Sequence, residues 1–123
     1  MKKLLLLIVC GLCAVCCSKE SAGIEKFEGK FSGSCEYVSD NGSSYHNITV
    51  KVKIQSNEIV VRSISGYSLP TLRYRITEEY DTKLGGYKND SEGYSYIDLW
   101  ENSLVLEYYP KGGNRYRLDL DKD

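Results

Sequence analysis

Two side chains of this sequence have the chemistry to take part directly in catalysis, His46 and Cys35. His46 is the only histidine, and a histidine can act as an acid or a base near neutral pH. Cys35 falls on the apolar side of an alternating segment, where we expect a buried and unreactive thiol. The residue order offers no set of nucleophile, base and orienting group. We therefore expect the protein not to be an enzyme.

Acidic residues between Glu78 and Gly93 raise the question of a metal site. Calcium sites use about six to eight oxygen ligands, but these carboxylates match no calcium loop, and Lys83 and Lys88 lie among them. One histidine and scattered cysteines also argue against the common zinc sites. We expect no metal and no cofactor. The stretch is predicted to be a solvated loop, with room for a short hairpin that turns at Leu84-Gly85-Gly86-Tyr87.

Tyrosine is the most distinctive residue type, with 11 copies in 123 residues. Its ring can stack on sugars or form the centre of a protein interface at small entropic cost. Strands also favour tyrosine for cross-strand pairs, which is a purely structural explanation. If a functional surface exists, we expect it where the loops 63–70 and 78–93 meet. The predicted binding surface consists of Tyr67, Tyr80, Tyr87, Tyr94, Tyr96 and Trp100.

The segments that must position these residues alternate between apolar and polar side chains, as β-strands do. Turn signals such as Asp40-Asn41-Gly42 and Ser56-Asn57-Glu58 separate them. No segment beyond the first seventeen residues shows a sustained helical period. We predict a single all-β domain over residues 26–123, an antiparallel meander of seven to eight strands. It closes into a barrel or folds into a sandwich.

The inward positions of such a barrel are bulky. A barrel of about eight strands is only just wide enough to be filled by side chains or to hold one small ligand. We expect a packed core here, because the inward positions include Phe27, Phe31, Tyr37, Tyr74, Tyr108 and Tyr116. Gly29-Lys30-Phe31 resembles the Gly-x-Trp start of lipocalins and related calycin barrels. The resemblance covers three residues, favours the barrel and transfers no ligand-binding residues.

The first seventeen residues have the pattern of a signal peptide, which we expect to be helical. Met1-Lys2-Lys3 is positive, and the apolar run from Leu4 to Val15 is too short to span a bilayer. Four of the 5 cysteines lie within this segment, so a disulfide framework is not expected. Residues 18–25 lack periodicity and are predicted to be a flexible tether.

Cysteines at the end of such a segment resemble the lipobox of small Gram-negative bacterial lipoproteins. In that family the signal is cut before a cysteine, which then carries diacylglycerol and often an acyl chain such as palmitate on its amine. The resemblance implies lipidation at Cys17, since the polar residues start directly after it. Cys16 is the alternative, because Ala14-Val15-Cys16 departs from the usual residues before the cut.

The net charge and the predicted location in the cell together restrict the function. Sixteen basic and seventeen acidic residues nearly cancel, which argues against a nucleic-acid binder. We expect a non-enzymatic lipoprotein anchored in the cell envelope, most simply in the outer membrane, that presents a β-domain to a protein or glycan. A secreted or periplasmic protein is the alternative location. The alternative functions are a calycin-like carrier of a small apolar ligand and an inhibitor or immunity protein that binds one enzyme. Oligomeric state stays open.

Overall fold

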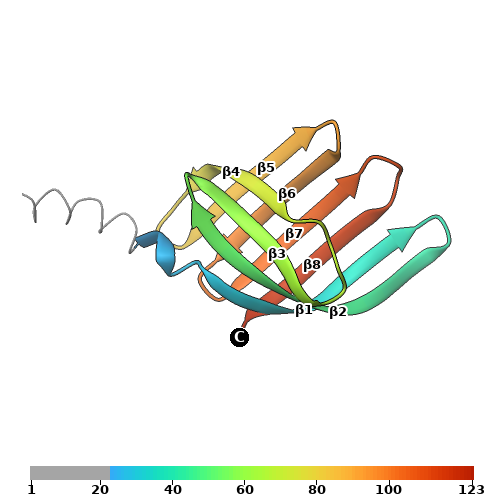
Figure 1. Ribbon diagram of the computed structural model, residues 1–123, viewed down its shortest axis with the longest axis horizontal. Coiled ribbons are helices and arrows are strands. Elements are labelled where there is room, and N and C mark those ends of the chain that lie inside the picture. Colours follow the sequence, from blue (N-terminus) through green and yellow to red (C-terminus); the bar gives the residue numbers. More distant parts are fainter. Residues whose placement is uncertain (1–22) are drawn as a thin grey trace, which may run out of the picture.

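The computed structural model describes residues 23–123, which form eight antiparallel strands in one closed barrel. Each strand pairs with the next one along the chain, and the last strand pairs with the first (Figure 1). The prediction of an all-β meander barrel is confirmed, and the sandwich is excluded. The strands are β1 (Gly29–Ser39), β2 (Gly42–Gln55), β3 (Glu58–Gly66), β4 (Leu72–Glu79), β5 (Lys83–Asp90), β6 (Gly93–Trp100), β7 (Ser103–Pro110) and β8 (Arg115–Lys122).

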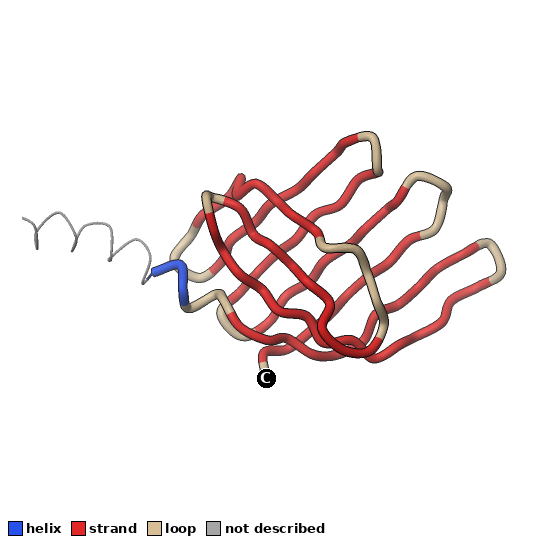
Figure 2. The backbone as a smooth tube through the Cα atoms, in the orientation of Figure 1, coloured by secondary structure: helices blue, strands red, loops and turns tan. Residues whose placement is uncertain are grey.

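The predicted signal peptide lies outside the described residues. The same holds for both candidate lipidation sites, Cys16 and Cys17, and for residues 18–22 of the predicted tether. The described chain begins with one helical turn at residues 23–25, shown in blue in Figure 2, and enters β1 four residues later.

Alternation along the strands produces the core. Successive side chains of a strand point to opposite faces, so in a closed barrel every second residue points inward. The inward residues of the central strands are almost fully excluded from solvent and contact one another in a single apolar cluster. Among its largest members are Phe31, Ile48, Ile59, Leu72, Tyr74, Leu84, Ile97, Leu99, Leu106 and Leu118. The expectation of a packed interior agrees with this cluster.

The β2–β3 connection is a two-residue turn and agrees with the sequence prediction. Ser56 and Asn57 both have positive φ angles, 53° and 62°, and Gln55 pairs with Glu58 across them. Two successive residues with positive φ form the hairpin turn whose twist matches that of the flanking strands.

The structure corrects the prediction for residues 78–93, where Glu78 and Glu79 still belong to β4 and half of the expected loop is strand β5. Leu84-Gly85-Gly86-Tyr87 lies within that strand and is not a turn. The two glycines are required by close approach, because a Cβ atom on Gly85 would lie 2.8 Å from the Glu78 carboxylate and one on Gly86 2.7 Å from the Arg75 carbonyl oxygen. The pairing of β4 with β5 also shifts register between Ile76 and Glu78. Glycines and a bulge hide the alternation that would reveal a strand.

The barrel has two different ends (Figure 1). At the end we call the N-terminal end lie residues 23–28, the turns after β2, β4 and β6, and the C-terminus of the chain. At the opposite end, the mouth end, the β1–β2, β5–β6 and β7–β8 hairpins turn, and the loop 67–71 joins β3 to β4.

The N-terminal segment is attached to the barrel by specific contacts. The Phe27 side chain is buried, and the Glu28 carboxylate accepts a hydrogen bond of 2.7 Å from the Ile54 backbone N–H. Lys122 at the end of β8 donates a 2.8 Å hydrogen bond to the Lys26 carbonyl, and its Nζ atom lies 5.6 Å from the centre of the Phe31 ring. These contacts join the first and last parts of the described chain.

Candidate functional site

Four tyrosine rings gather on the outside of the barrel, over β5, β6 and β7. Strand register brings them together: Tyr87 lies opposite Tyr96, and Tyr94 lies opposite Tyr109. The ring centres of Tyr94 and Tyr109 are 5.9 Å apart, and those of Tyr94 and Tyr96 are 6.3 Å apart. We call Tyr87, Tyr94, Tyr96 and Tyr109 the tyrosine face. Tyr94 and Tyr109 stand beside the hairpin turns of the mouth end.

The tyrosine face is exposed although its residues are large. Tyr87 is 54% exposed, Tyr94 41% and Tyr109 36%, and these three make up half of the large hydrophobic residues that are exposed between residues 23 and 123. Single exposed apolar residues are common on protein surfaces, whereas a contiguous group marks an interaction site.

A buried carboxylate holds the rings in place. Glu107 lies opposite Tyr96 on β7 and is only 8% exposed, because the neighbouring rings cover it. Its carboxylate accepts hydrogen bonds from the hydroxyls of Tyr96 and Tyr109, the second at 3.2 Å. Arg117 of β8 forms an ion pair with it at 3.5 Å. Glu107 and Arg117 lie directly opposite each other on β7 and β8, so this is a cross-strand pair of opposite charges.

These contacts fix the protonation states of the site. Burial by itself would raise the pKa of Glu107, but the hydrogen bonds from Tyr96 and Tyr109 and the Arg117 guanidinium outweigh it and lower the pKa below its ordinary value. The hydrogen bond to Glu107 raises the pKa of Tyr96 to about 12. At neutral pH Glu107 is therefore an anion and Tyr96 a neutral hydroxyl donor.

Hydrogen bonds inside the barrel also connect the strands that carry the tyrosine face. Tyr74 is fully buried, and its hydroxyl lies 2.5 Å from the Ser95 hydroxyl. Ser95 in turn donates a 2.7 Å hydrogen bond to the Glu107 backbone carbonyl. Buried polar groups of this kind are stable only when they are hydrogen-bonded. The chain of contacts links β4, β6 and β7 beneath the tyrosine face and keeps its backbone in place.

A second group of rings lies at the mouth end of the barrel. The centres of Tyr37 and Tyr116 are 4.9 Å apart, and Tyr108 stacks on Tyr116 at 5.8 Å. Tyr67 lies 4.8 Å from the His46 ring and donates a 3.4 Å hydrogen bond to the Tyr116 hydroxyl. We call Tyr37, His46, Tyr67, Tyr108 and Tyr116 the mouth cluster. These rings cover the apolar core at this end.

The six residues of the predicted binding surface therefore lie in different places. Tyr87, Tyr94 and Tyr96 share the tyrosine face, whereas Tyr67 belongs to the mouth cluster. Tyr80 lies in the β4–β5 turn at the N-terminal end. Trp100 lies on the outside of β6, but it is the last residue of that strand and so lies at the N-terminal end of the barrel, where the Lys83 ammonium is 5.8 Å from its ring centre.

Sequence reasoning missed two members of the site, Tyr109 and Glu107. Both belong to β7, whose alternation was recognised, but their neighbours depend on the register between β6 and β7. The available signal was the hairpin turn at Glu101-Asn102, since a short turn fixes the register of the strands that it joins. Counting outward from that turn pairs Tyr94 with Tyr109 and Tyr96 with Glu107.

Cys35 and His46, whose side chains could take part in catalysis, pack against other residues of the barrel. The Cys35 thiol is fully buried, and burial raises its pKa to about 11. His46 contacts the Ser44 hydroxyl at 3.1 Å and the Tyr67 ring. Within residues 23–123, no group of three or more His, Cys, Asp or Glu side chains is arranged to hold a metal ion.

Comparison with known proteins gives no relative for this chain. No family model matches it, and neither does any curated protein or solved structure. In the part of the chain that the structure describes, no helix combines the length and apolar character needed to cross a membrane.

Proposed function

We propose that this protein is a non-enzymatic envelope lipoprotein that binds a partner protein through the tyrosine face. The observation that carries the proposal is the group of four tyrosines on adjacent strands, of which Tyr87, Tyr94 and Tyr109 are exposed and Tyr96 and Tyr109 donate hydrogen bonds to a buried, charged Glu107. Tyrosines that are already ordered lose little conformational entropy on binding, which is why they are common at the centres of interfaces.

The form of the surface favours a protein over a glycan. The rings are tilted by 41° and 52° relative to their neighbours, so they present edges and hydroxyls as well as flat faces. A sugar stacks best on one flat face, whereas an uneven aromatic surface matches the packed centre of a protein interface.

The predicted location in the cell envelope supports the same proposal. The signal-like first seventeen residues and the lipobox-like end favour acylation of Cys17, or of Cys16, and two or three acyl chains give stable anchoring. The described chain starts at the N-terminal end of the barrel, and Tyr94 and Tyr109 lie near the mouth end. A lipid anchor before Gly23 would attach to the end of the barrel opposite the hairpin turns that flank Tyr94 and Tyr109.

Capture of the partner by the lipidated protein tests the proposal. We expect Tyr87→Ala and Tyr94→Ala each to weaken capture from an envelope extract by about tenfold, the effect of losing an interface hot spot. Thermal stability should stay nearly unchanged, because both side chains are substantially exposed. Tyr45→Ala is the matched control, since Tyr45 is 69% exposed on the outside of β2. Equal losses in all three variants would reject the tyrosine face as the binding surface.

The anchor requires its own measurement. Mass spectrometry of the mature protein should find Cys17 or Cys16 as the first residue, with its thiol and amine acylated. An unmodified mature amino terminus would remove the lipoprotein part of the proposal and leave the binding part to be tested separately.

A further inference from the structure

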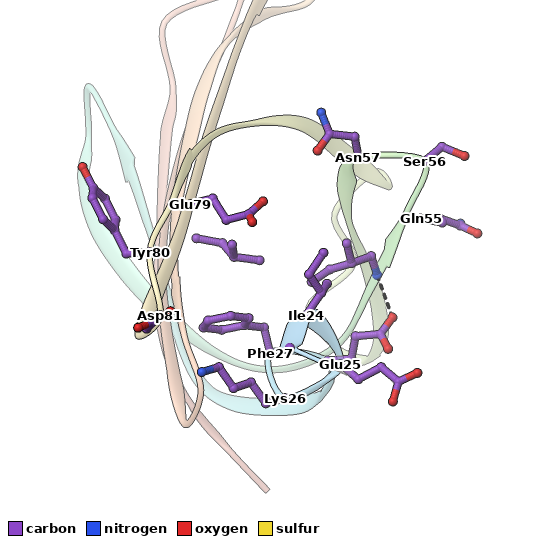
Figure 3. A pocket seen from close by; sticks show the side chains of 14 residues that line it. Ile24, Glu25, Lys26, Phe27, Gln55, Ser56, Asn57, Glu79, Tyr80 and Asp81 are labelled. Carbon is purple, nitrogen blue, oxygen red and sulfur yellow. Dashed lines mark hydrogen bonds between the residues drawn. The ribbon is translucent and has the colours of Figure 1, made fainter. Parts of the chain in front are cut away.

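Within the described residues, the N-terminal end of the barrel is only partly closed. Residues 23–28 cover one side of it, and a pocket of about 750 Å³ remains between this segment and the β2–β3 and β4–β5 turns. Figure 3 shows Ile24 and Phe27 pointing into the opening from one side and Glu79 pointing into it from β4, whereas Tyr80 and Gln55 point away. This N-terminal pocket lies at the far end of the barrel from the hairpins that flank the tyrosine face.

The floor of the pocket is apolar. Phe27 and Leu84 are buried members of the core, and Ile54 packs against the core while remaining half-buried. Ile24 is also half-buried, in the helical turn above Phe27. Covering half-buried aliphatic groups in a concave site with an apolar group removes their surface from water and lowers the free energy.

The rim of the pocket is acidic. Four lining residues carry carboxylates, Glu25, Glu28, Glu79 and Asp81, and only Lys26 carries a positive charge. Glu28 is engaged by the Ile54 N–H. Of the ion pairs formed within residues 23–123, none uses the other three carboxylates.

One cation–aromatic contact of the protein itself borders the pocket. The Lys26 Nζ atom lies 5.3 Å from the centre of the Phe27 ring, within the distance at which a cation is attracted to an aromatic face. An aromatic ring beside unpaired carboxylates is a suitable environment for an ammonium group. It disfavours an anion, because the carboxylates would repel it.

We propose that the N-terminal pocket binds a small organic ammonium ion with an apolar tail. The tail would lie on Ile24, Phe27 and Ile54, and the ammonium group would face Glu79. The inference does not rest on the tyrosine face or on lipidation. Its failure would leave the proposed function untouched.

Hexylamine, hexanoate and hexanol are matched probes, because they share the tail and differ in the charge of the head group. We expect hexylamine to bind the full chain in a neutral detergent saturably at pH 7. The NMR chemical-shift changes should be confined to residues 24–28, 54–57 and 79–81. Hexanol should bind more weakly, and hexanoate should not bind.

Charge variants identify the carboxylate. Glu79→Gln should weaken hexylamine binding by roughly fivefold, the effect of one partly exposed ion pair. Glu92→Gln is the control, an exposed acidic residue in the β5–β6 turn at the opposite end, and should leave binding unchanged. Ile24→Ser should weaken hexylamine and hexanol alike.

Three results would overturn the inference. They are equal binding of hexanoate, an equal effect of Glu79→Gln and Glu92→Gln, and the absence of saturable hexylamine binding.

Discussion

The two ends of the barrel are closed in different ways. At the mouth end, the strands and the β3–β4 loop close the barrel with their own rings, since Tyr37, Tyr108 and Tyr116 contact one another above the core. At the N-terminal end, a separate segment crosses the opening and inserts Phe27, and a pocket of about 750 Å³ is left beside it. The rings at the mouth end come mostly from the strands themselves, whereas a segment added from outside the sheet covers only the part of the N-terminal end that it reaches.

The difference bears on the carrier hypothesis. A ligand inside the barrel would have to displace core side chains such as Phe31, Leu106 and Leu118, which are fully buried. The room available for a small molecule lies at the N-terminal end and outside the apolar core. Binding through the outer surface or the N-terminal pocket agrees better with this packing.

The largest predicted effect concerns the segment that closes the N-terminal end. Phe27→Ala should lower the free energy of unfolding by about 3 kcal/mol, because it removes a fully buried ring. Phe27→Leu keeps most of the apolar volume and should cost only about 1 kcal/mol. Urea unfolding of the full chain measures both. If Phe27→Ala were as stable as the wild type, the segment would not be part of the folded barrel.

The mouth end should tolerate the equivalent change better. Tyr67→Ala is expected to lower the free energy of unfolding by about 1–2 kcal/mol, because Tyr67 is half-buried and its neighbours in the mouth cluster remain in place. The same urea measurement compares it with Phe27→Ala. A larger cost for Tyr67→Ala would reverse the comparison between the two ends.

A smaller, pH-dependent effect is expected at Glu107. Because its folded pKa lies below the unfolded value, its contribution is fully present above the unfolded pKa of about 4.3 and is lost as pH falls through the folded pKa. Glu107→Gln should therefore cost about 1–2 kcal/mol at pH 7, since it replaces an anion that accepts two tyrosine hydrogen bonds.

The loss should shrink as the pH falls through the lowered folded pKa of Glu107, where the wild-type carboxylate becomes protonated. Urea unfolding of both proteins at pH 7 and pH 3 tests this. A constant difference between them would show that the charge of Glu107 contributes nothing.

The smallest effect is expected at Cys35, which reports on closure of the mouth end. The thiol is buried beneath the mouth cluster with a pKa raised to about 11, so iodoacetamide should leave it unmodified in the folded protein at pH 7.5. Peptide mass spectrometry distinguishes Cys35 from the other cysteines. Rapid modification without denaturant would show that the mouth end opens, and unfolding in urea provides the positive control.

The sequence predicted individual strands and turns better than it predicted which residues lie side by side on neighbouring strands. Strands with clear alternation, such as β1 around Phe31 and Cys35, were recognised, and so was the Ser56-Asn57 turn. Strand β5 was not, because Gly85 and Gly86 stand where side chains would have marked its two faces.

The tyrosine face was only half predicted for a related reason. Tyr94 and Tyr96 drew attention as residue types, but Glu107 becomes part of the site only through the register of β6 with β7. Alternation gives the face on which a side chain lies and not which residue of the next strand lies beside it.

The most direct test of the central claim is site-specific photo-crosslinking on cells that display the lipidated protein. A photoreactive phenylalanine at position 87 should crosslink one partner protein, whereas the same group at position 45, on the outside of β2, should give no product. Equal products from the two positions, or none from position 87, would contradict the claim that the tyrosine face is the surface with which this protein acts.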